Sequence, residues 1–257
     1  MGCLSFWLSC VRDRGPATRY GRRVSVFRGF LDLLFPPACQ VCRRPGMFPL
    51  CTACRGAFRL VRSPVCQKCG KPLRGPSDLI FTCIPCRHRR LRFAVARAAG
   101  IYDGTLRDAI HALKFKGRRA LAAPLGALMA ERVAGARLPA ANLVIPVPLH
   151  HRRLRERGYN QSELLAAEIA NRFGLLVRSD VLVRRQATEA QSGLTLDDRR
   201  ANVRGAFLAA CSIEGQTVLL VDDVLSTGFT ASECARALRQ AGAAQVVVLT
   251  AAIAVLD

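Results

Sequence analysis

The chain has 257 residues and a mass of 28.0 kDa, which corresponds to one large domain or two smaller ones at about 150 residues per domain. Hydrophobic residues make up 51% and charged residues 22%, so the composition excludes a fully disordered chain. The longest nearly apolar run, residues 243–256, has 14 residues, whereas a membrane-spanning helix needs about 20. The first residues also lack the pattern of a secretory signal, and we expect a cytoplasmic protein with no membrane span.

The basic residues are unevenly distributed along the chain. The formal net charge is +21; residues 1–93 carry 18 basic and 3 acidic side chains, and residues 94–257 carry 21 and 15. This shift predicts a domain boundary near residue 93. An excess of arginine attracts nucleic-acid backbones, but a codon bias that favours arginine gives the same composition, so charge alone leaves both interpretations open.

The first residues of the chain show little pattern. Residues 1–25 have no clear periodicity and are predicted to form a disordered leader. Residues 26–35 have the pattern of a short amphipathic helix that ends at two prolines, which cannot continue a helix.

Eight of the 12 cysteines form four Cys-x-x-Cys pairs between residues 39 and 86. The pairs are Cys39 with Cys42, Cys51 with Cys54, Cys66 with Cys69, and Cys83 with Cys86. Each pair can supply two corners of a zinc tetrahedron, so residues 26–93 are predicted to form a double zinc ribbon with two structural Zn²⁺ ions and no open, catalytic position. The pairs can join in chain order or interleave. Disulfides conflict with a cytoplasmic location, and a single redox dithiol does not explain four pairs.

From residue 94 onward, β-like and helical stretches alternate. They cover residues 94–102, 106–115, 121–133, 143–147, 162–173 and 181–184, and, after a long polar insert, 217–222, 231–241 and 245–250. This alternation predicts an α/β domain over residues 94–257, with a mainly parallel sheet covered by helices on both faces. Ligands bind such sheets at the carboxyl ends of the strands.

The segment after residue 217 carries the clearest chemical signal. Four apolar residues precede Asp222 and Asp223, and the loop Ser226, Thr227, Gly228, Phe229 and Thr230 then leads into a predicted helix. Such a loop presents backbone N–H groups and the positive end of a helix dipole to a phosphate group. Two adjacent carboxylates accept hydrogen bonds from sugar hydroxyls. The pattern predicts a ribose 5-phosphate site, and it differs from both the P-loop and the Rossmann fingerprint.

A second loop follows the predicted strand at residues 143–147. Two prolines, one of them Pro148, stiffen this turn, and Arg152 and Arg153 come shortly after it. Guanidinium groups suit the dense negative charge of a diphosphate, so we expect this loop to bind one. The neighbouring histidines, His150 and His151, could contact phosphate or transfer a proton, but we expect them to face solvent.

The segment from residue 218 to 230 resembles the phosphoribosyl diphosphate (PRPP) motif of type I phosphoribosyltransferases. The wider chain resembles the ComF family of competence-associated proteins, which join a cysteine ribbon to a phosphoribosyltransferase domain. The similarity includes the segments 31–36, 112–118, 146–150 and 155–162 and covers about residues 28 to 252. It implies a type I phosphoribosyltransferase fold, and it implies that the insert at residues 185–207 is the loop that closes over the site.

The resemblance further implies a function. Asp222 and Asp223 would hold the ribose and assist catalysis, residues 226–230 would hold the 5-phosphate, and Mg²⁺ would accompany PRPP. The first hypothesis is a PRPP-binding phosphoribosyltransferase-type protein that handles single-stranded nucleic acid in DNA uptake during natural transformation, together with DNA-uptake or helicase proteins. The second is a non-enzymatic nucleic-acid adaptor that senses PRPP. The third is a nucleobase salvage transferase.

Overall fold

The computed structural model describes residues 36–75, 81–134, 138–186 and 196–255. By compactness the chain divides into one unit of Met1–Pro36 and a second unit of Pro37–Asp257. The predicted leader at residues 1–25 and the predicted helix at residues 26–35 lie outside the described residues. Within the described parts, no helix combines the length and the apolar character that crossing a membrane requires.

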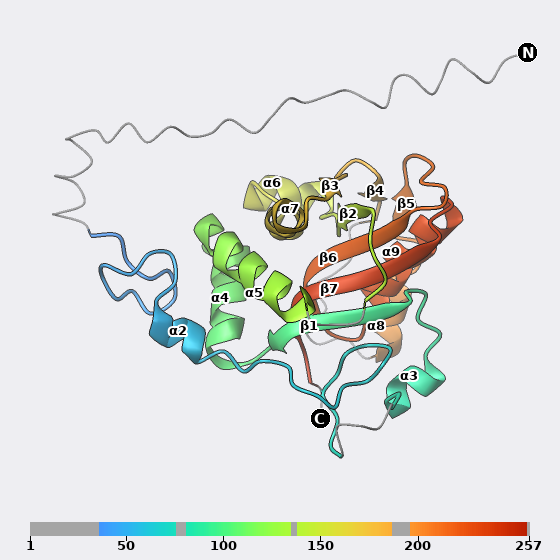
Figure 1. The fold of residues 1–257 in the computed structure, drawn as a ribbon. Coiled ribbons are helices and arrows are strands. Elements are labelled where there is room, and N and C mark those ends of the chain that lie inside the picture. Colours follow the sequence, from blue (N-terminus) through green and yellow to red (C-terminus); the bar gives the residue numbers. More distant parts are fainter. Residues whose placement is uncertain (1–35, 76–80, 135–137, 187–195, 256–257) are drawn as a thin grey trace, which may run out of the picture. The chain divides into compact units, whose positions relative to one another are not determined.

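A five-stranded sheet in the order β1-β7-β6-β2-β3 forms the centre of the second unit (Figure 1). Its strands are β1 (Val95–Ile101), β2 (Leu143–Pro146), β3 (Leu176–Val177), β6 (Thr217–Leu225) and β7 (Gln245–Ile253). All neighbouring strands in it pair in parallel, which confirms the predicted sheet. The predicted stretch at residues 181–184 forms β4 (Leu182–Arg184), which pairs antiparallel with β5 (Phe207–Ala209) instead of joining this sheet.

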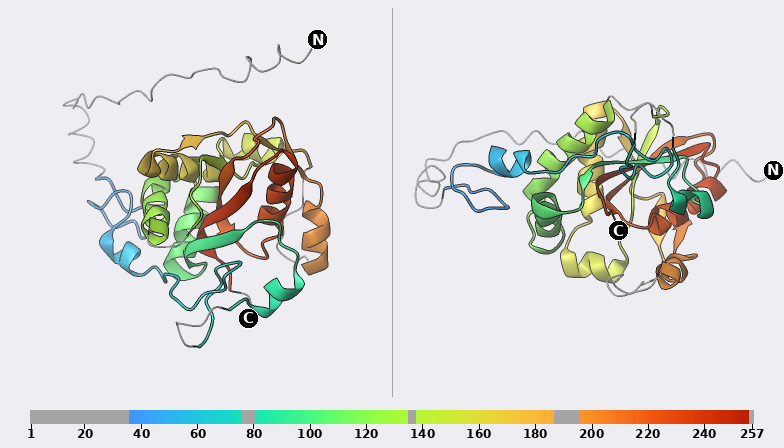
Figure 2. Two further views of the ribbon diagram at one scale, coloured as in Figure 1. Left: turned by 45° about the vertical axis from the view of Figure 1, so that its right-hand side comes forward. Right: turned by 90° about the horizontal axis from the view of Figure 1, so that it is seen from below.

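Helices cover both faces of the sheet (Figure 2). The helices α4 (Gly104–Phe115), α5 (Ala122–Ala134) and α7 (Gln161–Phe173) pack on one face, and α9 (Phe229–Gln240) packs on the other with β4 and β5. The remaining elements of this part of the chain are the 3₁₀ helix η1 (Arg119–Leu121), α6 (His151–Arg157) and α8 (Leu196–Val203). The alternation seen in the sequence therefore corresponds to the crossovers of a doubly covered sheet.

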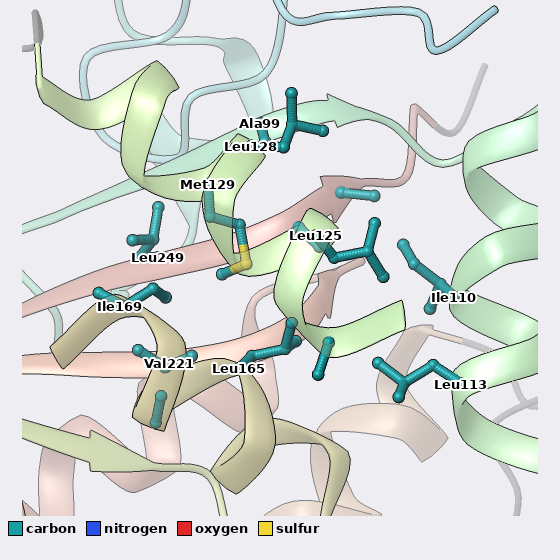
Figure 3. Close-up of a cluster of buried hydrophobic side chains, with 14 of the residues drawn as sticks. Ala99, Ile110, Leu113, Leu125, Leu128, Met129, Leu165, Ile169, Val221 and Leu249 are labelled. Carbon is teal, nitrogen blue, oxygen red and sulfur yellow. The ribbon is translucent and has the colours of Figure 1, made fainter. Parts of the chain in front are cut away.

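The central strands are apolar on both sides, as a sheet covered on both faces requires. In β6, Val221 faces the cluster under α4, α5 and α7, whereas its neighbour Leu220 faces the cluster under α9. Figure 3 shows the first cluster, in which Leu125 and Met129 of α5 and Leu165 of α7 lie over Val221 and Leu249 of the strands. Burial of each such side chain contributes about 1.5–3 kcal/mol, so this packing fixes the strand ends that carry the polar residues.

The connections leaving β2 and β6 depart to opposite faces of the sheet. These two strands are neighbours, with Pro146 beside Val221, but β2 leads to α7 on one face and β6 leads to α9 on the other. A crevice opens at the carboxyl ends of strands where the connections diverge in this way. The fold therefore places a cleft next to Asp222 and Asp223.

The cysteine-rich segment precedes β1 and contains the short helices α2 (Thr52–Gly56) and α3 (Ile84–His88). The segment around them bonds to β1: the N–H of Ala96 donates to the carbonyl of Lys68 at 2.8 Å, and the N–H of Ile101 donates to the carbonyl of Arg59 at 2.7 Å. Gly70 has a φ of 74°, and a Cβ there would lie 2.7 Å from the carbonyl oxygen of Ala96. Both the positive φ and this close approach require glycine.

Candidate functional site

The eight paired cysteines form two clusters in chain order. Cys39, Cys42, Cys51 and Cys54 form one cluster, and Cys66, Cys69, Cys83 and Cys86 form the other; within each, the sulfur atoms lie within 4.8 Å of one another. The interleaved arrangement left open by the sequence is thereby excluded. Two Sγ–Sγ distances, Cys42 to Cys51 and Cys69 to Cys83, are 3.7 Å. A zinc tetrahedron with Zn–S distances of about 2.3 Å has edges of about 3.8 Å, so the donor sets fit Zn²⁺.

Backbone N–H groups donate hydrogen bonds to cysteine sulfurs in both clusters. The N–H of Cys54 donates to the sulfur of Cys51 at 3.3 Å, and the N–H of Cys83 donates to the sulfur of Cys66 at 3.3 Å. A side-chain hydrogen bond with Cys69, together with such N–H donors, lowers the pKa of Cys66. Thiolates are the form that zinc binds.

A pocket of about 440 Å³ lies at the carboxyl ends of β2 and β6, which is a usual size for a small-molecule site. Of the predicted PRPP-binding residues, it is lined by Pro148, Arg153, Asp222, Asp223, Ser226, Gly228 and Thr230. Thr227, Phe229 and Arg152 are not among the residues that line it. The fold therefore brings both predicted loops to one cavity.

The two aspartates have different surroundings. Oδ1 of Asp222 accepts hydrogen bonds from the Ser162 hydroxyl and from the N–H of Asp223, both at 2.9 Å. Burial and the nearby charge of Asp223 raise the pKa of Asp222 to about 7. Asp223 is only 3% exposed, and its Oδ1 lies 2.8 Å from Nζ of Lys114. Burial alone would lower the pKa of Lys114, but the charge of Asp223 outweighs it and the pKa is raised.

The second oxygen of Asp223 has no hydrogen-bond partner among the described residues, although it is buried. Leaving a charged oxygen unsatisfied costs about 1–3 kcal/mol or more. An acceptor held in this state at the wall of a pocket is suited to a ligand that brings donors, such as sugar hydroxyls or a hydrated cation. This carboxylate fits Mg²⁺ for the same reason, because Mg²⁺ prefers oxygen ligands and keeps several waters.

The loop after β6 turns sharply into α9. Gly228 has a φ of 80° and precedes the first helical residue, Phe229, so the turn uses a conformation that favours glycine. The Thr227 hydroxyl accepts a hydrogen bond from the N–H of Phe229 at 3.4 Å, so this hydroxyl is used within the loop. Ser226, Gly228 and Thr230 line the pocket instead, close to the amino-terminal N–H groups of α9, where anions bind favourably.

Four cationic side chains also line the pocket. Residues 151–157 form α6, and Arg153 and Arg157, four residues apart on one face of this helix, line the pocket together with Arg184 and Lys114. Arg152 lies on a different face, is exposed and pairs with Glu156 at 3.0 Å. The helical spacing of α6 separates the adjacent arginines that the sequence had grouped.

The prediction that His150 faces solvent is wrong. His150 is 7% exposed, and its Nδ1 accepts a hydrogen bond from the N–H of Arg152 at 3.4 Å, which caps α6. Asn160 caps α7, because its side chain accepts a hydrogen bond from the N–H of Ser162 at 3.0 Å. Residues 187–195 of the predicted closing loop lie outside the described residues.

Sequence reasoning missed several residues of the pocket, among them Arg157 and Ser162. The signal for Arg157 was its position four residues after Arg153 on one helix. Gln161 and Ser162 begin α7, and this first turn of the helix also lines the pocket. Lys114 lines the pocket, whereas Lys116 is exposed; the sequence did not separate these two.

Comparisons with known proteins match both halves of the chain. A family model described as a double zinc ribbon domain matches residues 30–88, and one described as a phosphoribosyl transferase domain matches residues 160–255. Among solved structures, the glutamine PRPP amidotransferase of Bacillus subtilis aligns with a TM-score of 0.37 and 20% identity over 55% of this chain and 30% of that chain. A structural similarity at that level carries no argument by itself.

Two relatives align with the chain over most of their length. The DNA utilization protein YhgH of Salmonella typhi is 34% identical over 221 residues, which cover 83% of this chain and 96% of that protein. Competence protein F of Haemophilus influenzae is 30% identical over 215 residues, which cover 76% of this chain and 93% of that protein. The chain carries a double zinc ribbon followed by a phosphoribosyltransferase domain and aligns with these relatives over most of their length, so it belongs to the ComF family.

Proposed function

We propose that the chain binds PRPP in the pocket at the carboxyl ends of β2 and β6. The observation that supports this most is the buried, unpartnered Oδ2 of Asp223 beside the Gly228 turn. The two aspartates would accept hydrogen bonds from the ribose hydroxyls, and Ser226, Thr230 and the first N–H groups of α9 would hold the 5-phosphate. The pocket thus offers hydrogen-bond acceptors to the ribose and hydrogen-bond donors to the phosphate of the same ligand.

The cationic side chains of the pocket suit the diphosphate of the same ligand. Arg153 and Arg157 lie on one face of α6, and Lys114 reaches the aspartates from α4. Guanidinium groups bind phosphate oxygens in pairs of hydrogen bonds. A bound Mg²⁺ would neutralise charge that develops on the leaving diphosphate.

The reaction that these groups support is displacement at the anomeric carbon. A nucleophile forms a bond to that carbon, the bond between the carbon and the diphosphate oxygen breaks, and the diphosphate leaves with its electron pair. Asp222 and Asp223 stabilise the positive charge that develops on the sugar ring. They are the only carboxylates among the described residues that line the pocket. Asp222 or a water molecule therefore accepts the proton that the nucleophile loses.

Calorimetry with zinc-loaded protein, Mg²⁺ and PRPP tests the binding step. Wild-type protein and Asp108→Asn should give saturable heat, because Asp108 is an exposed carboxylate on α4 away from the pocket. Asp223→Asn should lose most of the affinity. Absence of heat from wild-type protein at millimolar PRPP would contradict the proposal.

Release of diphosphate separates an enzyme from a sensor. With nucleobases as candidate acceptors, an enzyme releases diphosphate in step with consumption of PRPP, and Asp223→Asn abolishes it. A protein that binds PRPP and releases none under any acceptor is a sensor, which is the second function that this pocket allows.

The biological role that we propose is handling of DNA taken up by the cell. It is supported by the relatives named DNA utilization protein and competence protein and by the net charge of +21, which favours a nucleic-acid partner. Deletion of the gene should lower recovery of transformants or growth on DNA as a nutrient. Restoration by wild-type protein but not by Asp223→Asn would tie that role to the pocket.

A further inference from the structure

A second groove lies on the opposite side of the loop that connects β6 to α9. Its volume is about 1310 Å³. It is bounded by the segment after α3, by the end of α8 and by the first turns of α9; the residues lining it include His88–Arg92, Arg200–Ala201, Val203–Gly205, Phe229, Ser232, Glu233 and Arg236. Phe229 faces this groove, whereas its neighbours Gly228 and Thr230 line the pocket. One loop therefore forms a wall of both cavities.

The groove is strongly basic. Its lining residues include six arginines, at positions 89, 90, 92, 200, 204 and 236, and one carboxylate, that of Glu233. Oε2 of Glu233 is already bound by Nε of Arg236 at 2.9 Å and by the N–H of Gly205 at 3.0 Å. In the part of the chain that the structure describes, no carboxylate pairs with Arg90, Arg200 or Arg204. The positive charge of the groove is thus left for a ligand.

Direct contacts hold the walls of the groove in place. The N–H of Arg92 donates to the Ser232 hydroxyl at 3.0 Å, and Nη1 of Arg89 donates to the carbonyl of Thr227 at 3.3 Å. The guanidinium carbon of Arg89 also lies 5.4 Å from the centre of the Phe229 ring, a favourable cation–π distance. Because the segment is fixed to α9 and its preceding loop, the arginines converge on one groove from three parts of the chain.

We propose that this groove binds the backbone of single-stranded nucleic acid. Its arginines match a row of phosphates, and the apolar side chains of Leu91 and Phe229 lie among them, where unpaired bases can contact them. A duplex offers mainly phosphates at such a surface, and an acidic peptide offers no flat apolar group. The inference extends the proposed function, because it assigns the nucleic-acid partner to particular residues outside the PRPP pocket.

The size of the effect follows from release of counterions. Each phosphate contact to a single strand contributes a slope of about −0.7 in log K against log salt concentration. If a variant and the wild type bind equally at about 1 M salt, then at about 0.1 M salt the loss of one contact weakens binding about fivefold and the loss of two contacts about 25-fold. We therefore choose two exposed arginines that make no described ion pair, Arg200 and Arg204.

Fluorescence anisotropy of an oligothymidylate of about 20 nucleotides with the zinc-loaded full chain tests the proposal. The double variant Arg200→Ala/Arg204→Ala should bind about 25-fold more weakly at about 0.1 M salt, with a salt slope lower by about 1.4. Arg172→Ala is the matched control, because Arg172 is an exposed arginine on α7, on the opposite face of the sheet. Zinc content and PRPP calorimetry should be unchanged in all three proteins.

Four outcomes would overturn the assignment. Wild-type protein does not bind the oligonucleotide, the double variant binds it as the control does, a duplex of the same length binds as tightly, or a polyglutamate of equal charge displaces the strand equally well. The PRPP calorimetry is measured separately on the same samples. If the oligonucleotide assay contradicts the groove while PRPP still binds, the proposal for the pocket stands. If PRPP does not bind but the oligonucleotide binds as expected, the proposal for the groove stands.

Discussion

Replacing Asp222 with asparagine should stabilise the protein while removing its affinity for PRPP. Burial and Asp223 raise the pKa of Asp222 from 3.8 to about 7, so at pH 8 the folded protein must hold a charge that the unfolded chain holds more easily. At about 1.36 kcal/mol per pKa unit, the shift corresponds to at most about 4 kcal/mol. Asp222 keeps some contact with solvent, and we expect about 2 kcal/mol. The asparagine oxygen can still accept from Ser162 and from the N–H of Asp223.

The gain should depend on pH in a defined direction. The folded state of the wild type binds a proton at Asp222 as pH falls through about 7, so its stability rises between pH 8 and about pH 4 and the advantage of the variant disappears. Urea unfolding of zinc-loaded protein at several pH values measures this, and the melting temperature at pH 8 should rise by about 5 °C. Asp108→Asn should show no such change. A variant that is equally stable or less stable at pH 8 would refute the reasoning.

Three further outcomes test other parts of the structure. Lys114→Ala should lower the free energy of unfolding by about 3 kcal/mol because it leaves the buried carboxylate of Asp223 without its cation, and Lys114→Met/Asp223→Asn should recover most of that loss in urea titrations. Gly228→Ala should cost about 1–2 kcal/mol because of its positive φ, and should weaken PRPP binding in calorimetry. Elemental analysis should find two zinc ions per wild-type chain and about one in Cys51→Ala; two in that variant would contradict the separate clusters.

The sequence predicted the sheet, its helices and the two cysteine clusters because these depend on local pattern and spacing. The apolar run before Asp222 predicted a buried strand, and the glycine before Phe229 predicted a turn, since both follow from nearest neighbours along the chain. The pairing of cysteines in chain order could not be decided, because two Cys-x-x-Cys turns join through space.

Other parts of the pocket depended on tertiary structure. Lys114 belongs to a helix more than a hundred residues before Asp223, and nothing local distinguishes it from Lys116. Arg152 and Arg153 are adjacent in sequence, but the helix that contains them directs only Arg153 to the pocket. His150 was misjudged because a histidine that caps a helix with its ring nitrogen has no sequence signature of its own.

The hydrogen bonds between β1 and the cysteine-rich segment affect how the protein should behave when zinc is scarce. β1 is the outermost strand of the sheet, and its outward-facing backbone groups are covered by Arg59, Val61 and Lys68. An uncovered strand at that position is a template on which a second molecule can add its own strand. Shortage of zinc should therefore harm this protein first through aggregation at this edge strand.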